Sequence, residues 1–169
     1  MKKSVSQVKS DDSRERFSQV VCTHSHAMFR VARAVLDSDA DAEDAVSEAV
    51  LRAWQAWGRL RKQEAARAWL LKITVNCAYE LRRKAGRVVV MDDMEGLAGV
   101  SEDRHYQDLW DAMQALPEEQ RAVVLLFYYE DLPLAQIAHI LGVAQGTVKS
   151  RLSRARGRLR KFLDEEESK

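Results

Sequence analysis

Residues 132–159 read LPLAQIAHILGVAQGTVKSRLSRARGRL, and the spacing of apolar residues in this stretch decides the fold of the C-terminal part of the chain. Apolar side chains recur at helical intervals on both sides of Gly142, which stands where a tight turn needs a left-handed backbone. The first predicted helix buries Ile137, Ala138, Ile140 and Leu141, and the second buries Val148, Leu152, Ala155 and Leu159. The small side chain of Ala138 lets the two helices cross closely. The pattern therefore predicts a helix-turn-helix.

The solvent face of the second predicted helix carries side chains that suit the major groove of DNA. Arg and Lys donate hydrogen bonds to guanine edges, and serine can bond to either base type. The further basic residues of the helix would lie against phosphates and release counterions. The residues on this face are Lys149, Ser150, Ser153 and Arg154. The alternative is a basic amphipathic helix on an ordinary helical bundle, and the residues alone leave both interpretations open.

The composition of the 169 residues favours an all-helical chain of two small domains. Apolar residues make up 46% of the sequence, enough for packed cores, and there are only 7 glycines and 2 prolines to interrupt helices. No long apolar run predicts a membrane span, and the polar residues 1–12 do not form a secretory signal. Two isolated cysteines predict a reduced protein. We therefore expect a cytoplasmic location.

The net charge of +1 conceals a strong segregation of charge along the chain. Residues 37–48 and 92–119 are acidic, whereas 59–87 and 149–161 are basic. Two basic blocks, each at the end of a predicted helical unit, indicate two contacts with a polyanion. Either block taken alone is explained equally well as a solvated helix face.

The remaining periodicity predicts further helices, two of them before residue 132 in the second domain, and the boundaries between domains. Helical stripes cover 17–36, 42–57 and 68–84, and together they would form a compact first domain. The full division predicted is a disordered leader at 1–12, a helical domain at 13–87, a flexible acidic linker at 88–104, a helix-turn-helix domain at 105–164 and an acidic tail at 165–169.

Two groups of residues invite interpretation as a metal site or an active site. Cys22, His24 and His26 contain metal-binding side chains, but His24 lies on a different helix face from the other two. Partly buried helix positions explain them more simply, and any redox role of Cys22 and Cys77 stays open. The carboxylates of 37–48 could suggest a nuclease, but no His or Lys is arranged near them as a general base. We therefore predict neither an enzyme nor a cofactor.

Three stretches together resemble the extracytoplasmic-function sigma factors of bacterial RNA polymerase, which belong to group IV of the sigma factors. Residues 132–159 are similar to their upstream promoter-reading region, which is part of sigma region 4. DAEDAVSEAVLRAW, from Asp41, resembles their polymerase-binding helix, and AWLLKITVNCAYELRRKAGR, from Ala68, resembles the helix of region 2 that approaches the downstream promoter element. The three matches keep the family's order and spacing from Phe17 to Leu163.

The resemblance implies roles for individual residues. Those expected to dock on a coiled coil of the polymerase's largest subunit are Asp44, Ser47 and Glu48. Those expected at the opened downstream element, where one base is flipped into a pocket, are Arg61, Lys62, Arg67, Asn76, Arg82 and Arg83. Those expected at the upstream element are Gly146, Thr147, Lys149, Ser150, Ser153 and Arg154. The implied partners are polymerase core, promoter DNA and an anti-sigma factor, with no direct membrane insertion.

Some residues depart from the family's pattern. Ser47 replaces a commoner glutamine, and Gln136, Ala144 and Ser153 differ from the usual residues of the upstream-reading region. No aromatic residue lies between Leu60 and Trp69, which predicts weak melting of DNA and a demand for near-consensus promoters. A stand-alone helix-turn-helix regulator is the alternative function, although such a protein has no use for the helix that begins at Asp41.

Overall fold

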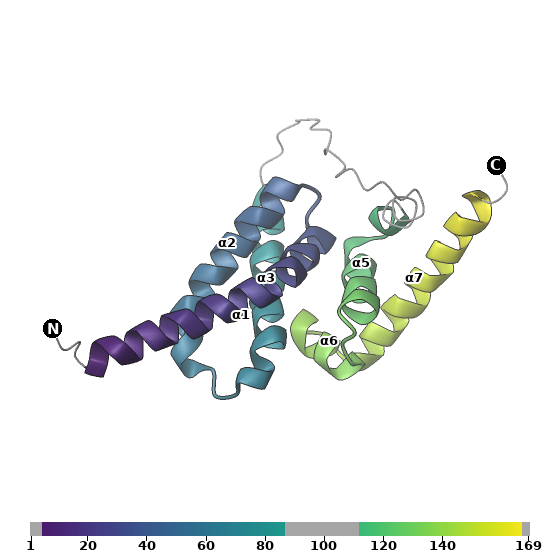
Figure 1. The fold of residues 1–169 in the computed structure, drawn as a ribbon. Helices are drawn as coiled ribbons and strands as arrows, with labels where there is room; N and C mark the ends of the chain where they lie inside the picture. Colours follow the sequence, from purple (N-terminus) through teal and green to yellow (C-terminus); the bar gives the residue numbers. More distant parts are fainter. Residues whose placement is uncertain (1–4, 87–111, 167–169) are drawn as a thin grey trace.

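The computed structural model describes residues 5–86 and 112–166, and this part of the chain is helical, without strands (Figure 1). Helices α1 (Val5–Val35), α2 (Asp39–Ala56) and α3 (Ala66–Ala85) form an N-terminal unit, with short 3₁₀ turns at Trp57–Arg59 and Gln63–Ala65. The C-terminal unit contains α5 (Glu118–Val124), a π-helical turn at Leu125–Tyr129, α6 (Leu134–Leu141) and α7 (Gln145–Glu166). The predicted linker at 88–104 lies outside the described residues.

Helix α2 lies close to α1 and α3 because its inner face consists of alanines. Ala42, Ala45, Ala49 and Ala53 are fully buried. Ser38 caps the start of the helix, because its hydroxyl accepts a hydrogen bond from the Asp41 backbone N–H at 3.1 Å. Asp39 and Asp41 in the first turn complement the helix dipole.

Aromatic side chains hold the far end of α2 against α1 and α3. Phe17 contacts Trp54 and Trp57 with ring centroids 5.1 and 5.2 Å apart, and Trp57 lies 6.3 Å from Trp69. The periodicity predicts that Trp54 is buried, but 41% of it is exposed. The smaller alanines occupy the space between the helices, and the Trp54 indole packs at its edge against Phe17.

Helix α1 begins earlier than predicted. The sequence predicts a disordered leader over 1–12, but the helix starts at Val5, so the prediction is wrong for residues 5–12. Arg16 forms an ion pair with Asp12 one turn earlier at 2.6 Å, a spacing that supports a helix at this point. At the other end of the chain, α7 continues to Glu166, two residues into the predicted tail.

The predicted helix-turn-helix is confirmed as α6, a turn and α7. Gly142 adopts φ 66° and ψ 34°, the left-handed conformation that the sequence predicts for it. The Val143 N–H then bonds to the Ala138 carbonyl at 3.1 Å and closes the helix end. Four buried side chains fill the space between the two helices: Ile137, Ile140, Val148 and Leu152.

Candidate polymerase and promoter interfaces

A groove between α2 and α3 brings the predicted polymerase-binding residues together. Asp44, Ser47 and Glu48 line it beside Leu51, and its volume is about 370 Å³. Leu51 is 60% exposed although it is a large apolar residue. Carboxylates next to an exposed leucine fit a partner that is itself both basic and apolar.

Arg52 connects this groove to α3, and the sequence analysis missed it. Its guanidinium donates hydrogen bonds to Glu48 at 2.7 Å and to both carboxylate oxygens of Glu80 at 3.0 and 2.8 Å. These bonds raise the pKa of Arg52 and lower the pKa of the Glu80 carboxyl. The four-residue spacing of Glu48 and Arg52 is the signal that could have identified the first half of this bridge.

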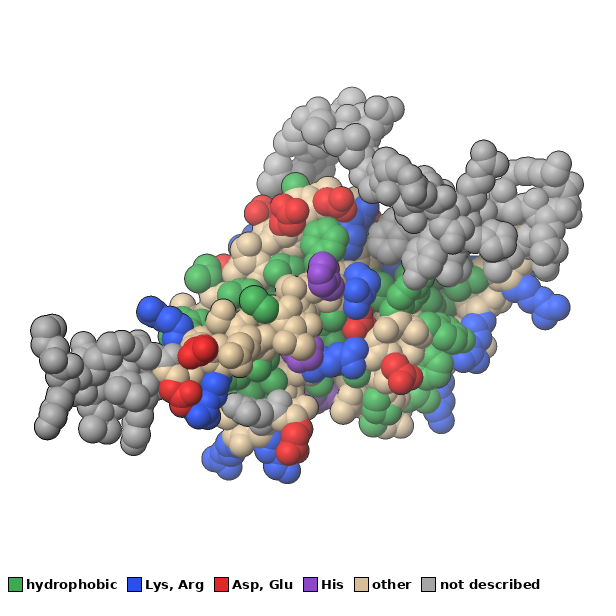
Figure 2. Space-filling view, viewed as in Figure 1, with side chains coloured by type: hydrophobic (Ala, Val, Ile, Leu, Met, Phe, Trp, Pro, Cys, Tyr) green, Lys and Arg blue, Asp and Glu red, His purple; other side chains and the backbone are tan. Residues whose placement is uncertain are grey.

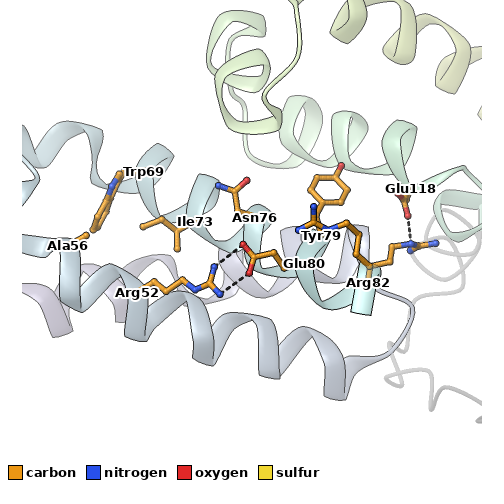
Figure 3. Close-up of a pocket in the computed structure, with 10 residues that line it drawn as sticks. Arg52, Ala56, Trp69, Ile73, Asn76, Tyr79, Glu80, Arg82 and Glu118 are labelled. Atoms are coloured by element: carbon orange, nitrogen blue, oxygen red, sulfur yellow. Dashed lines mark hydrogen bonds and ion pairs between the residues drawn. The ribbon is translucent and has the colours of Figure 1, made fainter. Parts of the chain in front are cut away.

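The predicted downstream-element residues lie along α3 and the loop before it. Asn76 is exposed in a groove of about 850 Å³ that Trp69, Ile73 and Arg83 also line (Figure 3). Arg61 and Lys62 are exposed in the loop between the two 3₁₀ turns. The groove thus combines an amide, apolar surface and cations, which is what an unpaired nucleobase on a phosphate backbone requires.

Two aromatic residues of α3 modify the expectation from the sequence. Trp69 falls on the apolar stripe over 68–84, a position where the sequence predicts burial, but it is half-buried and lines the groove. Tyr79, which the prediction omits, lines it too. Burial, and secondarily the carboxylate of Glu118, raise the pKa of the Tyr79 hydroxyl. The loop before α3 has no aromatic residue, but α3 itself presents Trp69 and Tyr79 to the groove.

Arg67 and Arg82, both predicted to bind the downstream element, contact the C-terminal unit and keep more than a third of their side chains exposed. Arg67 donates to the Glu130 carboxylate at 2.7 Å and to the Glu130 carbonyl at 2.8 Å. Arg82 forms an ion pair with Glu118, as Figure 3 shows. Glu130 is only 2% exposed, and a buried carboxylate without a cation would cost several kcal/mol. Such a carboxylate requires its arginine partners.

The predicted upstream-reading face of α7 points to solvent. Lys149, Ser153 and Arg154 are exposed, and among the described residues Lys149 and Arg154 have no ion pair. Gly146 and Thr147 lie in the first turn of the helix, where backbone N–H groups are available to a phosphate. Figure 2 shows the basic side chains that project along this edge of the molecule.

Neighbouring side chains of α7 fix the helix on the C-terminal unit. Ser150 is half-buried, and its hydroxyl donates to the Thr147 carbonyl at 3.0 Å. Arg151 pairs with Glu119 at 2.9 Å, and Arg156 donates to the Tyr128 hydroxyl at 2.7 Å. Arg151 and Arg156 are thus bonded within the C-terminal unit, whereas Lys149 and Arg154 stay available to a ligand.

The histidine and cysteine residues form no further site in the described part of the chain. Cys22 is exposed and Cys77 is buried, and burial raises the pKa of the Cys77 thiol. Burial and the nearby Arg67 lower the pKa of His24. Among residues 5–86 and 112–166, no three His, Cys, Asp or Glu side chains are placed to hold a metal ion. None of the helices in these residues is long and apolar enough to cross a membrane.

Comparison with protein families matches both units. The family Sigma-70 region 2 matches residues 20–88, and Sigma-70 region 4 matches residues 106–159. The ECF RNA polymerase sigma factor SigM of Mycobacterium tuberculosis is 38% identical over 157 residues, covering 89% of this chain and 78% of that protein. The chain belongs to the extracytoplasmic-function sigma factors. The resemblance read from the sequence is confirmed, and the protein is an alternative sigma factor that directs promoter recognition in transcription initiation.

Other relatives support the same family and fold. The RNA polymerase sigma factor SigV of Bacillus subtilis is 34% identical over 151 residues, covering 87% of this chain and 90% of that protein. The sigma factor RpoE of Bartonella quintana, solved in complex with the anti-sigma factor NepR, has a TM-score of 0.75 at 29% identity and covers 89% of this chain and 98% of that one. CnrH, solved with the cytosolic domain of CnrY, has a TM-score of 0.64 at 25% identity, with 89% of each chain covered.

Proposed function

We propose that this sigma factor divides its work among three surfaces. Asp44, Ser47 and Glu48 of α2 bind the polymerase core. The groove of α3 and the preceding loop bind the opened downstream element, and the outer face of α7 reads the upstream element as duplex. The observation that carries the proposal is that each set of residues falls on one surface of one helical unit, with the chemistry its ligand requires.

The downstream surface would combine phosphate contacts with capture of a base. Arg61, Lys62 and Arg83 are exposed and placed for phosphates, while Asn76 offers an amide to the edge of a flipped base. Trp69 would supply a stacking surface, and stacking contributes about 1–3 kcal/mol per base. With Trp69 in this position, the weak melting predicted from the loop alone would be partly offset.

The proposal extends to domain boundaries, partners and location. A polymerase-binding and downstream-binding domain would end near residue 87, and the upstream-binding domain would begin near residue 105. RpoE was solved with the anti-sigma factor NepR, and we propose that an anti-sigma partner also controls this chain. A protein that acts on polymerase and promoter DNA works in the cytoplasm and performs no catalysis of its own.

The decisive experiment measures polymerase binding and initiation with two matched variants. Core polymerase without sigma is titrated with the parent chain, with Glu48→Lys and with Glu43→Lys, and each complex transcribes a genomic promoter library. Both substitutions reverse one exposed charge on α2, but only Glu48 lines the groove. We expect the parent and Glu43→Lys to bind core and transcribe a narrow promoter set.

Glu48→Lys is expected to bind core at least thirtyfold more weakly, because breaking a charge pair that is desolvated at an interface costs about 2–5 kcal/mol. Equal loss in both variants would contradict the assignment of the groove. If the parent does not bind core but footprints duplex DNA alone, the protein acts as a stand-alone regulator and the assignments on α2 and α3 fail.

A further inference from the structure

The middle of α7 carries an arginine, Arg156, on the side of the helix that is assigned to the upstream duplex. It follows Lys149 by seven residues and Ser153 by three, so these side chains share one face of the helix. All three are exposed, and the exposed Arg160 continues the same stripe one turn later. Arg156 therefore belongs to the same face of α7 as two of the residues expected to read bases.

Two aromatic side chains of the neighbouring π-helical turn flank this arginine. The guanidinium carbon of Arg156 lies 5.9 Å from the centre of the Phe127 ring and 5.7 Å from that of the Tyr128 ring. The two rings meet edge to face, with their centroids 5.0 Å apart. The Arg156 Nε–H also donates a hydrogen bond to the Tyr128 hydroxyl at 2.7 Å. Together these contacts hold a long side chain, which would otherwise sample many rotamers, in one orientation.

The turn that carries the two rings has an unusual backbone. Leu125–Tyr129 is wound as a π-helix, and the Glu130 N–H bonds to the Leu125 carbonyl, five residues earlier, at 3.1 Å. Asp131, just after it, has a positive φ of 50°. The turn continues α5, which lies beside α7 (Figure 1). Single π-helical turns inside helices are frequent at functional sites, and this one presents its aromatic residues to a helix that is assigned to DNA.

The bonding partner of Arg156 is neutral, which distinguishes it from Arg151 on the same helix. Arg151 pairs with the Glu119 carboxylate at 2.9 Å, so its charge is compensated. Among the described residues Arg156 has no carboxylate partner, and its terminal amino groups donate no hydrogen bond. The fold thus fixes this guanidinium without neutralising it. Such a group is suited to bind an anion, because no ion pair has to be broken first.

We propose that Arg156 contacts the phosphate backbone that borders the upstream element, and that Tyr128 and Phe127 are positioning residues for this contact. An α-helix rises about 1.5 Å per residue, so Arg156 lies about 10 Å beyond Lys149 along α7. The first residues of a recognition helix meet the base edges, and the major groove is about 12 Å wide. Two turns further along, the helix therefore meets the strand at the edge of the groove. The inference rests on the upstream role proposed for α7.

The chemistry of this contact differs from that of the residues that read bases. A guanidinium has five N–H donors, of which the bond to Tyr128 uses one, so both terminal amino groups of Arg156 are available to one phosphate. A phosphate contact carries no sequence information, but it releases counterions from the DNA. The contact therefore adds affinity for every duplex by the same factor and makes binding more dependent on salt.

The test measures binding of the full chain to two duplexes over a series of salt concentrations. One duplex carries the upstream element of a promoter that the parent holoenzyme transcribes, and the other is a scrambled sequence of equal length. Arg156→Gln removes the charge, and Tyr128→Phe removes only the hydroxyl that accepts from Arg156. Tyr129→Phe removes the hydroxyl of the next residue and is the matched control. Thermal unfolding of each chain gives its midpoint temperature, which shows that the variant is folded during the binding measurement.

We expect Arg156→Gln to weaken binding to both duplexes about tenfold and to reduce the slope of log affinity against log salt concentration by about one. Tyr128→Phe is expected to weaken binding to both about threefold with the slope unchanged, because the charge remains. In the Arg156→Gln background it has no further effect, because Tyr128 acts through Arg156. Tyr129→Phe binds both duplexes like the parent.

Three results would overturn the proposal. A structural role alone for Arg156 lowers the unfolding midpoint and leaves the salt slope unchanged. A loss confined to the promoter duplex identifies a base contact instead of a phosphate contact. Equal effects of Tyr128→Phe in the parent and in the Arg156→Gln background show that Tyr128 does not position Arg156. Failure of the proposed function gives a different result, because the parent itself would then bind the promoter duplex and the scrambled duplex equally.

Discussion

The helices α3 and α7 are both basic, and both are assigned to promoter DNA, yet two of the cations assigned on α3 are paired while two of those assigned on α7 are not. On α3, Arg67 and Arg82 are paired with carboxylates of the other unit. On α7, Lys149 and Arg154 are exposed and have no ion pair within the described residues. A basic helix is thus available to a polyanion only where the rest of the fold leaves it uncovered.

The two helices also differ in what fixes them. The orientation of α7 depends on a local turn at Gly142 and on contacts within its own unit. The state of α3 depends on partners far away in sequence: Glu130 is 63 residues from Arg67 and 100 from Arg30. Local contacts thus fix α7, whereas the surroundings of α3 depend on long-range contacts.

The largest effect expected from a change on α7 is that of Arg154→Ala. A bidentate contact to a base contributes about 1–3 kcal/mol, so affinity for the upstream duplex falls roughly fivefold to a hundredfold and selectivity at one position relaxes. The loss is expected in the free protein as well as in holoenzyme, because Arg154 is already exposed. Fluorescence anisotropy with the upstream duplex and its single-base variants measures both.

Arg158→Ala is the matched control for this change, since Arg158 is exposed one turn further along α7. It is expected to weaken binding to all duplexes by the same factor and to reduce the salt dependence. If Arg154→Ala lowered affinity only in holoenzyme, α7 would also depend on long-range contacts, and the contrast between the helices would fail.

A smaller effect is expected from Gly142→Ala, which tests the local turn. A Cβ at Gly142 meets no atom within 4 Å, so the cost comes from the left-handed backbone alone and amounts to about 1–2 kcal/mol. The midpoint temperature of thermal unfolding and the affinity for the upstream duplex both decrease, and the affinity for core polymerase does not change. Gly142→Asn is expected to lose less, because asparagine adopts this conformation more readily. Equal losses for Ala and Asn would indicate that the turn does not limit the presentation of α7.

Sequence patterns predicted the parts of the molecule that local contacts determine. The stripes of α2, the turn at Gly142 and the exposed face at Lys149 and Arg154 each depend on spacings of a few residues. The helix at residues 5–12 was missed because charged side chains without an apolar stripe look like a solvated leader.

The patterns did not predict the packing between the two units. Glu118 follows Pro117 in the first turn of α5, a position where an acid is explained by the helix dipole alone. Glu130 comes directly after a π-helical turn and next to Asp131, which has a positive φ of 50°. Nothing in either local sequence indicates an arginine of another unit. The same limit applies to Trp69, whose apolar spacing predicts burial but whose indole lines the groove beside Asn76.

Reversible locking of the interface tests the contrast between α3 and α7 most directly. In a Cys22→Ser/Cys77→Ala chain, Lys72→Cys and His139→Cys place thiols at a contact between α3 and α6 and are joined by a short bis-methanethiosulfonate spacer. The same variant capped with methyl methanethiosulfonate is the control, because it carries both modifications without the link. We expect the linked protein to bind the upstream duplex like the control, to fail to bind the downstream single strand or to initiate transcription, and to recover both on reduction. Initiation by the linked protein at the rate of the control would contradict the account.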